Sequence, residues 1–116
     1  MSKVLEEYTN TARLTDDNIS SQIVDAATDE MYLYIDRIEV SVYKAASSLT
    51  DGILELLDSD GEWVWTMNVG SVKERQFEFG NEGLRVGKAT GLQALLSGAS
   101  TQASVSLAIV WHLDVE

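Results

Sequence analysis

Apolar and polar side chains alternate more regularly over residues 100–116 (STQASVSLAIVWHLDVE) than anywhere else in this sequence. Every odd position from 103 to 115 is apolar: Ala103, Val105, Leu107, Ile109, Trp111, Leu113 and Val115. A two-residue period is typical of a β-strand with one buried face. Leaving this row in water would cost about 1.5–3 kcal/mol for each large side chain. We therefore expect an interior strand here, and loss of folding when the chain is cut before Trp111.

Short segments rich in β-branched and aromatic residues, separated by turn signals, fill the sequence from residue 21 onward. We expect strands at 21–25, 31–45, 75–79, 84–86, 92–98 and 103–113, a hairpin over 53–69 that turns at Asp60–Gly61, and a loop over 45–52. Within 31–45 the apolar residues change parity between Ile35 and Ile38. One inserted residue reverses the alternation, so this change predicts a β-bulge near Asp36–Arg37.

These segments amount to about eight strands, without a long helical pattern. A lone sheet could not cover so many apolar faces, so we predict an all-β fold: an antiparallel β-sandwich of jelly-roll type over residues 21–116. Residues 1–20 are expected to form an extended N-terminal arm, with a short amphipathic helix as the alternative. Removing residues 1–12 should then leave the fold intact.

The charge balance narrows the class of partner. The chain of 116 residues has 19 acidic and 8 basic residues, a net charge of −11. This argues against direct contact with nucleic acid or an anionic membrane, because both reward Lys and Arg. No apolar run reaches the roughly 18 residues of a membrane-spanning helix, and residues 1–10 lack the apolar stretch of a secretory signal. We expect a protein that is made in the cytoplasm of its host cell and is not secreted.

The sequence contains few of the residues from which catalytic sites are usually built. There is no cysteine and one histidine, His112, which the alternation places on the polar face of the last strand as a partly exposed residue. The DSDG sequence at 58–61 lacks the ligand spacing of a calcium loop and is interpreted as a hairpin turn. Residues 80–91 lack a phosphate-binding loop, because Glu82 and Ala89 stand where it requires Gly and Ser or Thr. We expect no enzymatic activity, no cofactor and no metal.

The aromatic residues suggest core positions and one candidate interface. Trp63 and Trp65 share their parity with Met67, which favours burial; a sugar-stacking platform is the alternative. Tyr32 and Tyr34 alternate with apolar residues, so both faces of this strand are apolar or aromatic. Either the strand is buried on both sides or one side meets another subunit, where tyrosine is enriched. We therefore treat both tyrosines as candidate partner-binding residues.

The order of these motifs is similar to that of small β-sandwich virion proteins of tailed bacteriophages. The resemblance covers residues 21–113 and includes LYIDRIEVSVY, GILELLDSDGEWVW and FEFGNEGLRVGKATGLQALLSGASTQASVSLAIVWHL. The matching positions are Gly83, Leu84, Val86, Gly91, Leu92, Leu96, Gly98 and the alternating segment 103–113. None of these residues carries a reaction, so the resemblance implies a mechanical role.

The resemblance implies a capsid decoration (cement) protein on the exterior of the virion capsid. Its partners would be the major capsid protein and further copies of itself, arranged as a trimer. A tail- or neck-associated module and a carbohydrate-binding module are the alternatives. Apolar residues of the arm could anchor it on a neighbouring subunit or on the shell. With the two tyrosines, the candidate partner-binding residues are Leu5, Tyr8, Leu14, Tyr32 and Tyr34.

Overall fold

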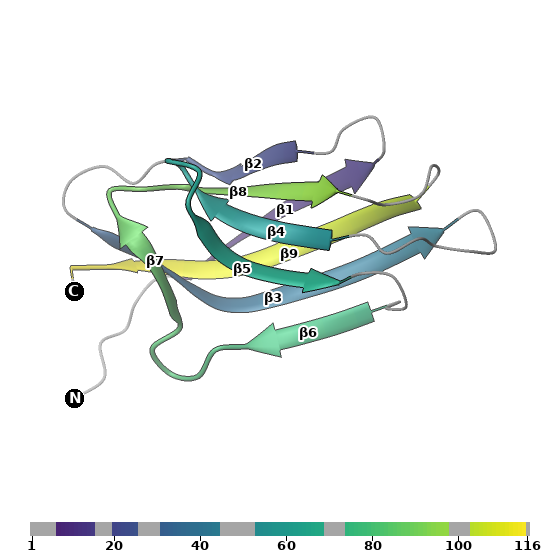
Figure 1. The fold of residues 1–116 in the computed structure, drawn as a ribbon. Helices are drawn as coiled ribbons and strands as arrows, with labels where there is room; N and C mark the ends of the chain where they lie inside the picture. Colours follow the sequence, from purple (N-terminus) through teal and green to yellow (C-terminus); the bar gives the residue numbers. More distant parts are fainter. Residues whose placement is uncertain are drawn as a thin grey trace.

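Two antiparallel β-sheets lie face to face in the computed structural model of this chain (Figure 1). The structure describes residues 7–15, 20–25, 31–44, 53–68, 74–97 and 103–115. Over these residues the strands are β1 (Tyr8–Thr15), β2 (Ser20–Val24), β3 (Tyr32–Lys44), β4 (Ile53–Asp58), β5 (Trp63–Asn68), β6 (Glu74–Glu78), β7 (Leu84–Lys88), β8 (Leu92–Ser97) and β9 (Ala103–Asp114). The predicted all-β antiparallel sandwich is confirmed. The predicted loop over 45–52 lies outside the described residues.

One sheet has five strands and the other has four. The five-stranded sheet runs in the order β1-β9-β3-β6, with β7 also paired to β3. The four-stranded sheet runs in the order β2-β8-β4-β5. In Figure 1, β7 climbs from the five-stranded layer toward the four-stranded one. In the described part of the chain, no helix is long and apolar enough to cross a membrane.

Strand β9 occupies the interior position that its alternation predicts. It pairs with β1 on one side and with β3 on the other (Figure 1). Val105, Leu107 and Ile109 are almost fully buried, so the odd-numbered row faces the second sheet. Because β9 bonds to β1 on one side and to β3 on the other, its loss would leave the backbone groups of both neighbours unpaired along that edge and would divide the five-stranded sheet.

Strand β1 brings part of the predicted arm into the sheet. Residues 8–15 pair antiparallel with β9, and Leu14, opposite Val105, is fully buried. Asn10 ties this strand to both sheets: its Nδ2 donates to the Ile23 carbonyl oxygen at 2.7 Å, and its Oδ1 accepts from Trp111 Nε1 at 2.9 Å. Removing residues 1–12 would delete these contacts. The structure therefore predicts that such a cut destabilises the fold, contrary to the expectation from the sequence.

Two β-bulges decide which side chains reach the interior. The predicted bulge in β3 lies between Ile35 and Arg37, where the register against β9 shifts. A second bulge, not foreseen, lies in β5 at Val64, because the partners of Leu56 and Leu57 are Trp65 and Trp63. It turns Val64 toward the core and leaves Trp63 60% exposed. The expectation of a buried Trp63 is thus wrong, because the bulge reverses the alternation there.

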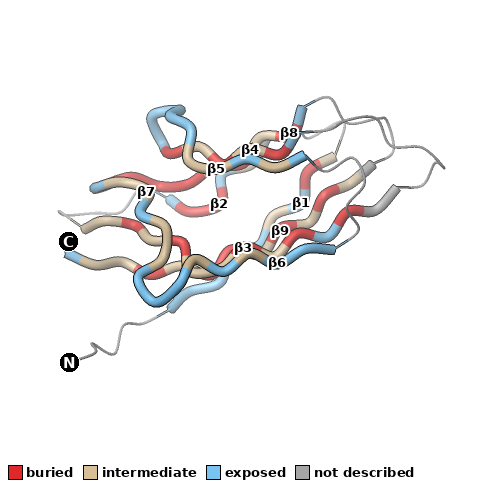
Figure 2. Tube along the Cα trace, turned by 60° about the horizontal axis from the view of Figure 1, so that its bottom comes forward, coloured by how far each residue is buried: buried red, intermediate tan, exposed pale blue. Residues whose placement is uncertain are grey.

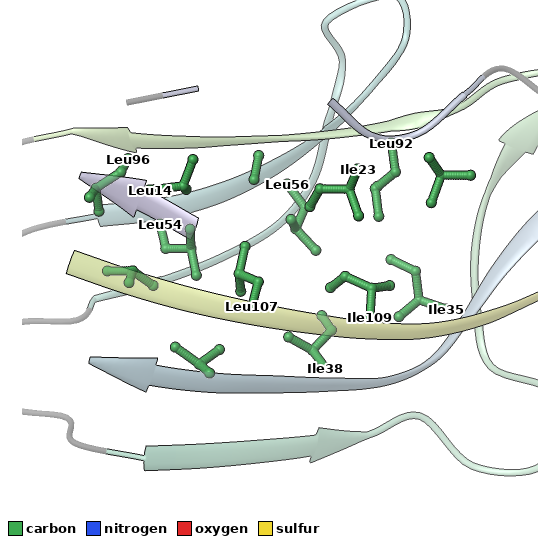
Figure 3. Close-up of a cluster of buried hydrophobic side chains, with 14 of the residues drawn as sticks. Leu14, Ile23, Ile35, Ile38, Leu54, Leu56, Leu92, Leu96, Leu107 and Ile109 are labelled. Carbon is green, nitrogen blue, oxygen red and sulfur yellow. The ribbon is translucent and has the colours of Figure 1, made fainter. Parts of the chain in front are cut away.

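The core fills the space between the sheets, with side chains from both layers. Figure 3 shows the labelled members of this cluster pointing toward one another: Leu14, Ile23, Ile35, Ile38, Leu54, Leu56, Leu92, Leu96, Leu107 and Ile109. Along the strands, buried residues alternate with more exposed ones (Figure 2). At one edge of the sandwich, Trp65 meets Phe77 of the other sheet edge-to-face, with ring centroids 5.1 Å apart. Burial on one face of each sheet leaves two outer faces for contacts with partners.

The DSDG segment forms the hairpin turn between β4 and β5, as predicted. Gly61 adopts a φ of 86°, and its amide donates to the Asp58 carbonyl oxygen at 3.0 Å. The Asp58 carboxylate accepts from the amides of Asp60 and Glu62, both at 2.9 Å. Its oxygen is therefore used to close the turn.

Candidate functional site: the outer faces of the two sheets

The single histidine lies on the outer face of the five-stranded sheet and is buried there. His112 Nδ1 is 2.8 Å from Asp36 Oδ2, and the His112 side chain is 8% exposed. The Tyr34 ring is stacked on the imidazole, with centroids 5.2 Å apart and planes 6° from parallel. The expectation of a partly exposed histidine is corrected: Tyr34 covers the ring, and the bulge in β3 brings Asp36 beside it. The contact gives the buried imidazole a polar partner in the half-buried Asp36 carboxylate.

A small hollow adjoins this pair. Its volume is about 510 Å³, and it is lined by Glu7, Asp36, Arg37, Glu78, Gly80, Asn81 and Val110. A hydrogen bond and charge repulsion from Asp36 raise the pKa of Glu7 above its usual value, while His112 and Arg37 act in the opposite direction. Among the described residues, no group of three or more His, Cys, Asp or Glu side chains is arranged to hold a metal ion.

Tyr32 and Tyr34 also lie on this outer face. Between them Leu33 is fully buried, which explains why both faces of the strand are apolar: one side is core. On the other side, two side chains of the paired strand β7 lie over Tyr32: Arg85 Cζ is 4.9 Å and Lys88 Nζ is 6.0 Å from its ring centroid. Both tyrosines are half-buried. They thus form one patch with two cationic side chains, a contact geometry worth about 0.5–2 kcal/mol.

The arm residues do not gather with these tyrosines. Tyr8 is 40% exposed and packs against Trp111, with ring centroids 4.8 Å apart. Leu14 is fully buried in the core of its own chain. Leu5 lies outside the described residues. The five candidates therefore fall in different places, and only Tyr32 and Tyr34 are neighbours on one face.

The outer face of the four-stranded sheet carries several apolar residues, of which only Trp63 stood out in the sequence. Ile53 is 44% exposed and Trp63 is 60% exposed. Leu57, opposite Trp63, and Leu95, opposite Glu55, are half-buried beside them. We call Ile53, Leu57, Trp63 and Leu95 the apolar strip. The runs LELL in β4 and ALL in β8 were the available signal, because adjacent apolar residues in a strand must face both ways.

The strip does not form a sugar-stacking platform from both tryptophans. Trp63 points outward, whereas Trp65, opposite the buried Leu56, packs against Phe77 at the sandwich edge. The Val64 bulge separates the two rings onto different faces. Trp63 and Trp65 therefore do not form the shared sugar-stacking platform that their spacing in the sequence suggested.

Comparison with known proteins gives likeness in fold. No protein-family model and no curated protein matches the chain in sequence. A chain of the acidic stable capsid structure of Helicobacter pylori bacteriophage KHP30 has a TM-score of 0.62 and 12% identity, covering 94% of this chain and 90% of that one. A chain of the cyanophage Pam1 capsid asymmetric unit has a TM-score of 0.56 and 11% identity, covering 96% of this chain and 86% of that one. The chain thus shares its fold, over most of its length, with chains of two phage capsid structures.

Proposed function

We propose that this chain is a structural virion protein: a capsid decoration (cement) protein that binds the outer surface of a tailed-phage capsid. The observation that carries the proposal is the end-to-end likeness to chains of the two phage capsid structures. The likeness covers most of both chains in each comparison. The shared unit is therefore a complete sandwich, and the sequence resemblance to small phage virion proteins points the same way.

Decoration needs a rigid body with more than one contact surface. A closed core between two sheets supplies the rigidity, and the two outer faces supply the surfaces. We assign Tyr8, Tyr32 and Tyr34 to contacts with neighbouring copies in a homotrimer, since tyrosine buries area and retains a polar tip. Leu5 remains a proposed anchor on a neighbour or on the shell. Leu14 is left out, because its side chain already fills this chain's own core.

The proposed function can be tested in two steps. Mass spectrometry of purified virions of the encoding phage should detect the chain, and shells assembled from the major capsid protein alone should bind it and then resist heating better. Absence from virions together with no binding to shells would refute a capsid role, and presence only in isolated tails would favour the tail or neck module. The mass in solution tests the trimer separately, with a strict monomer as the contrary result.

The arm needs its own variant. Removing residues 1–6 deletes Leu5 but keeps all of β1, so the fold should survive. If the arm anchors the protein, shell binding or trimer formation should weaken. Unchanged binding and unchanged mass would remove Leu5 from the proposed contacts.

A carbohydrate-binding module is the second candidate, and the exposed Trp63 ring is the observation that favours it. A single exposed ring can stack on a sugar. Saturable quenching of tryptophan fluorescence by a glycan, lost in Trp63→Ser, would favour this function over decoration.

A further inference from the structure

We propose that the outer face of the four-stranded sheet is the surface that docks on the capsid shell, and that the shell offers there an apolar groove flanked by Lys or Arg. The inference rests on the proposed function and names which side of the sandwich faces the shell. It also gives the chemistry of the partner surface. Two independent features of the described residues carry it: an apolar strip and a one-sided distribution of charge.

The apolar strip runs diagonally across three strands. Trp63 on β5 lies opposite Leu57 on β4. Leu95 on β8 lies opposite Glu55, and therefore diagonal to both Ile53 and Leu57. Two of the four exposed large apolar side chains of the described chain, Ile53 and Trp63, belong to this strip. An exposed Trp beside half-buried Leu residues is typical of the anchors that dominate protein interfaces.

The basic residues of the described chain all lie in one of the two sheets. The described residues 20–25, 53–68 and 90–97, which build the four-stranded sheet and its hairpin, contain no Lys or Arg. They contain five acidic residues: Asp25, Glu55, Asp58, Asp60 and Glu62. Every described Lys or Arg lies in the five-stranded sheet: Arg13, Arg37, Lys44, Arg75, Arg85 and Lys88. A partner that covers the four-stranded sheet must therefore bring the positive charge itself.

Glu55 makes this requirement specific. Its carboxylate is half-buried within the strip, between strands whose outward neighbours are Leu95 and Thr66. Covering the strip would remove this charge from water, and a buried charge without a partner is strongly unfavourable. A Lys or Arg of the partner placed at Glu55 would satisfy it and fix the register of docking.

A second copy of this chain fits the strip poorly. Face to face, two such sheets would bring acidic residues against acidic residues, which costs binding energy. The five-stranded sheet of another copy is also an unsuitable partner. Seven described acidic residues accompany its basic residues in the same segments. Four of the basic side chains also have contacts within their own chain: Arg37 pairs with Glu39 at 3.0 Å, Arg75 lies over the Phe77 ring, and Arg85 and Lys88 lie over the Tyr32 ring.

The test measures binding of the full chain to shells assembled from the major capsid protein alone. Trp63→Ser should weaken binding about thirtyfold, which is the loss of affinity typical of truncating a residue at the centre of an interface. Glu55→Lys should weaken it about tenfold or more, and added salt should weaken binding of the unaltered protein. Two matched controls lie away from the strip: Val115→Ser, at a residue that follows β9 and is 61% exposed, and Glu74→Lys, at an exposed residue of β6 in the other sheet. Both should bind within about threefold of the unaltered protein.

The possible results distinguish an error in the proposed docking face from an error in the proposed capsid role. If the unaltered protein binds shells but Trp63→Ser and Glu55→Lys bind equally well, the docking face is wrong while the capsid role stands. If the controls lose binding instead, the five-stranded sheet is the docking face. If Trp63→Ser abolishes the protein's own oligomer, the strip binds a second copy of the chain, and the inference is overturned. Saturable sugar binding at Trp63 would overturn it too, because the occupant would then be a glycan. Each variant is first checked for an unchanged thermal melt.

Discussion

Replacing Leu14 by alanine tests whether the N-terminal segment belongs to the folded domain or is an appendage to it. Leu14 is fully buried and lies opposite Val105 of β9. The substitution removes three carbon atoms from the space between the sheets, and β9, the strand beside Leu14, is paired on both sides. The rigid surroundings limit how far the structure can relax to fill it.

The expected cost is large. Leu→Ala changes at fully buried sites cost about 2–5 kcal/mol, and we expect about 3 kcal/mol here. For a chain of 116 residues, the whole free energy of unfolding is on the order of 6–17 kcal/mol. At roughly 3–6 °C per kcal/mol for a domain of this size, the melting temperature should fall by about 10 °C or more.

Urea unfolding followed by circular dichroism measures this free energy directly. Arg13→Ala is the matched control, because Arg13 is the preceding residue in β1 and is exposed on the outer face. The control should lie within about 0.5 kcal/mol of the unaltered protein. A Leu14→Ala variant that unfolds at the same urea concentration as the control would show that β1 is not part of the stable sandwich.

Three further changes test other parts of the fold. A chain cut after Val110 loses the paired end of β9 and should be insoluble or unfolded by circular dichroism; a folded product would contradict the role given to β9. Gly83→Ala should destabilise the protein more than Gly61→Ala, because both have positive φ but only at Gly83 would a Cβ approach a backbone oxygen, Ile35 O, at 2.9 Å; equal melting temperatures would refute this. The raised pKa of Glu7 means that its stabilising contribution is complete below the unfolded value of 4.5 and is lost as pH rises through the raised pKa. The unfolding free energy of the unaltered protein minus that of Glu7→Gln should therefore fall as the pH rises above about 4.5, and a constant difference would contradict it.

The two outer faces differ in a way that bears on capsid attachment. One carries the Tyr34–His112 stack and the cationic side chains beside Tyr32. The other carries the apolar strip, and the charged residues described in that sheet and its hairpin are all acidic. Under the decoration role proposed above, the protein would have to distinguish the shell from its own copies, and two faces of different chemistry would provide that distinction.

Sequence periodicity predicted the strands wherever one face is apolar and the other polar. β9 shows this best, and its interior position followed from the cost of exposing its apolar row. The bulge in β3 was also predictable, because Ile35 and Ile38 lie on opposite parities of one strand and both must be buried. In each case the information is local, within a few residues of one strand.

The bulge in β5, by contrast, has no signal in the sequence pattern. Trp63, Val64 and Trp65 are all apolar, so a shift of register does not disturb any visible pattern. Pairing with β4 decided that Val64 turns inward and that Trp63 faces outward. The exposed tryptophan, and with it the apolar strip, therefore depends on contacts between strands.

The sequence by itself determined that this chain forms an antiparallel β-sandwich closed by its last strand. Only the tertiary structure decided that β1 joins the five-stranded sheet, because Leu14 acquires its burial from β9, about ninety positions later in the chain. It also decided the state of His112, whose cover and partner come from Tyr34 and Asp36 on another strand. Alternation along a strand specifies which side is buried, whereas the neighbours of each side chain are set by pairing between segments distant in sequence.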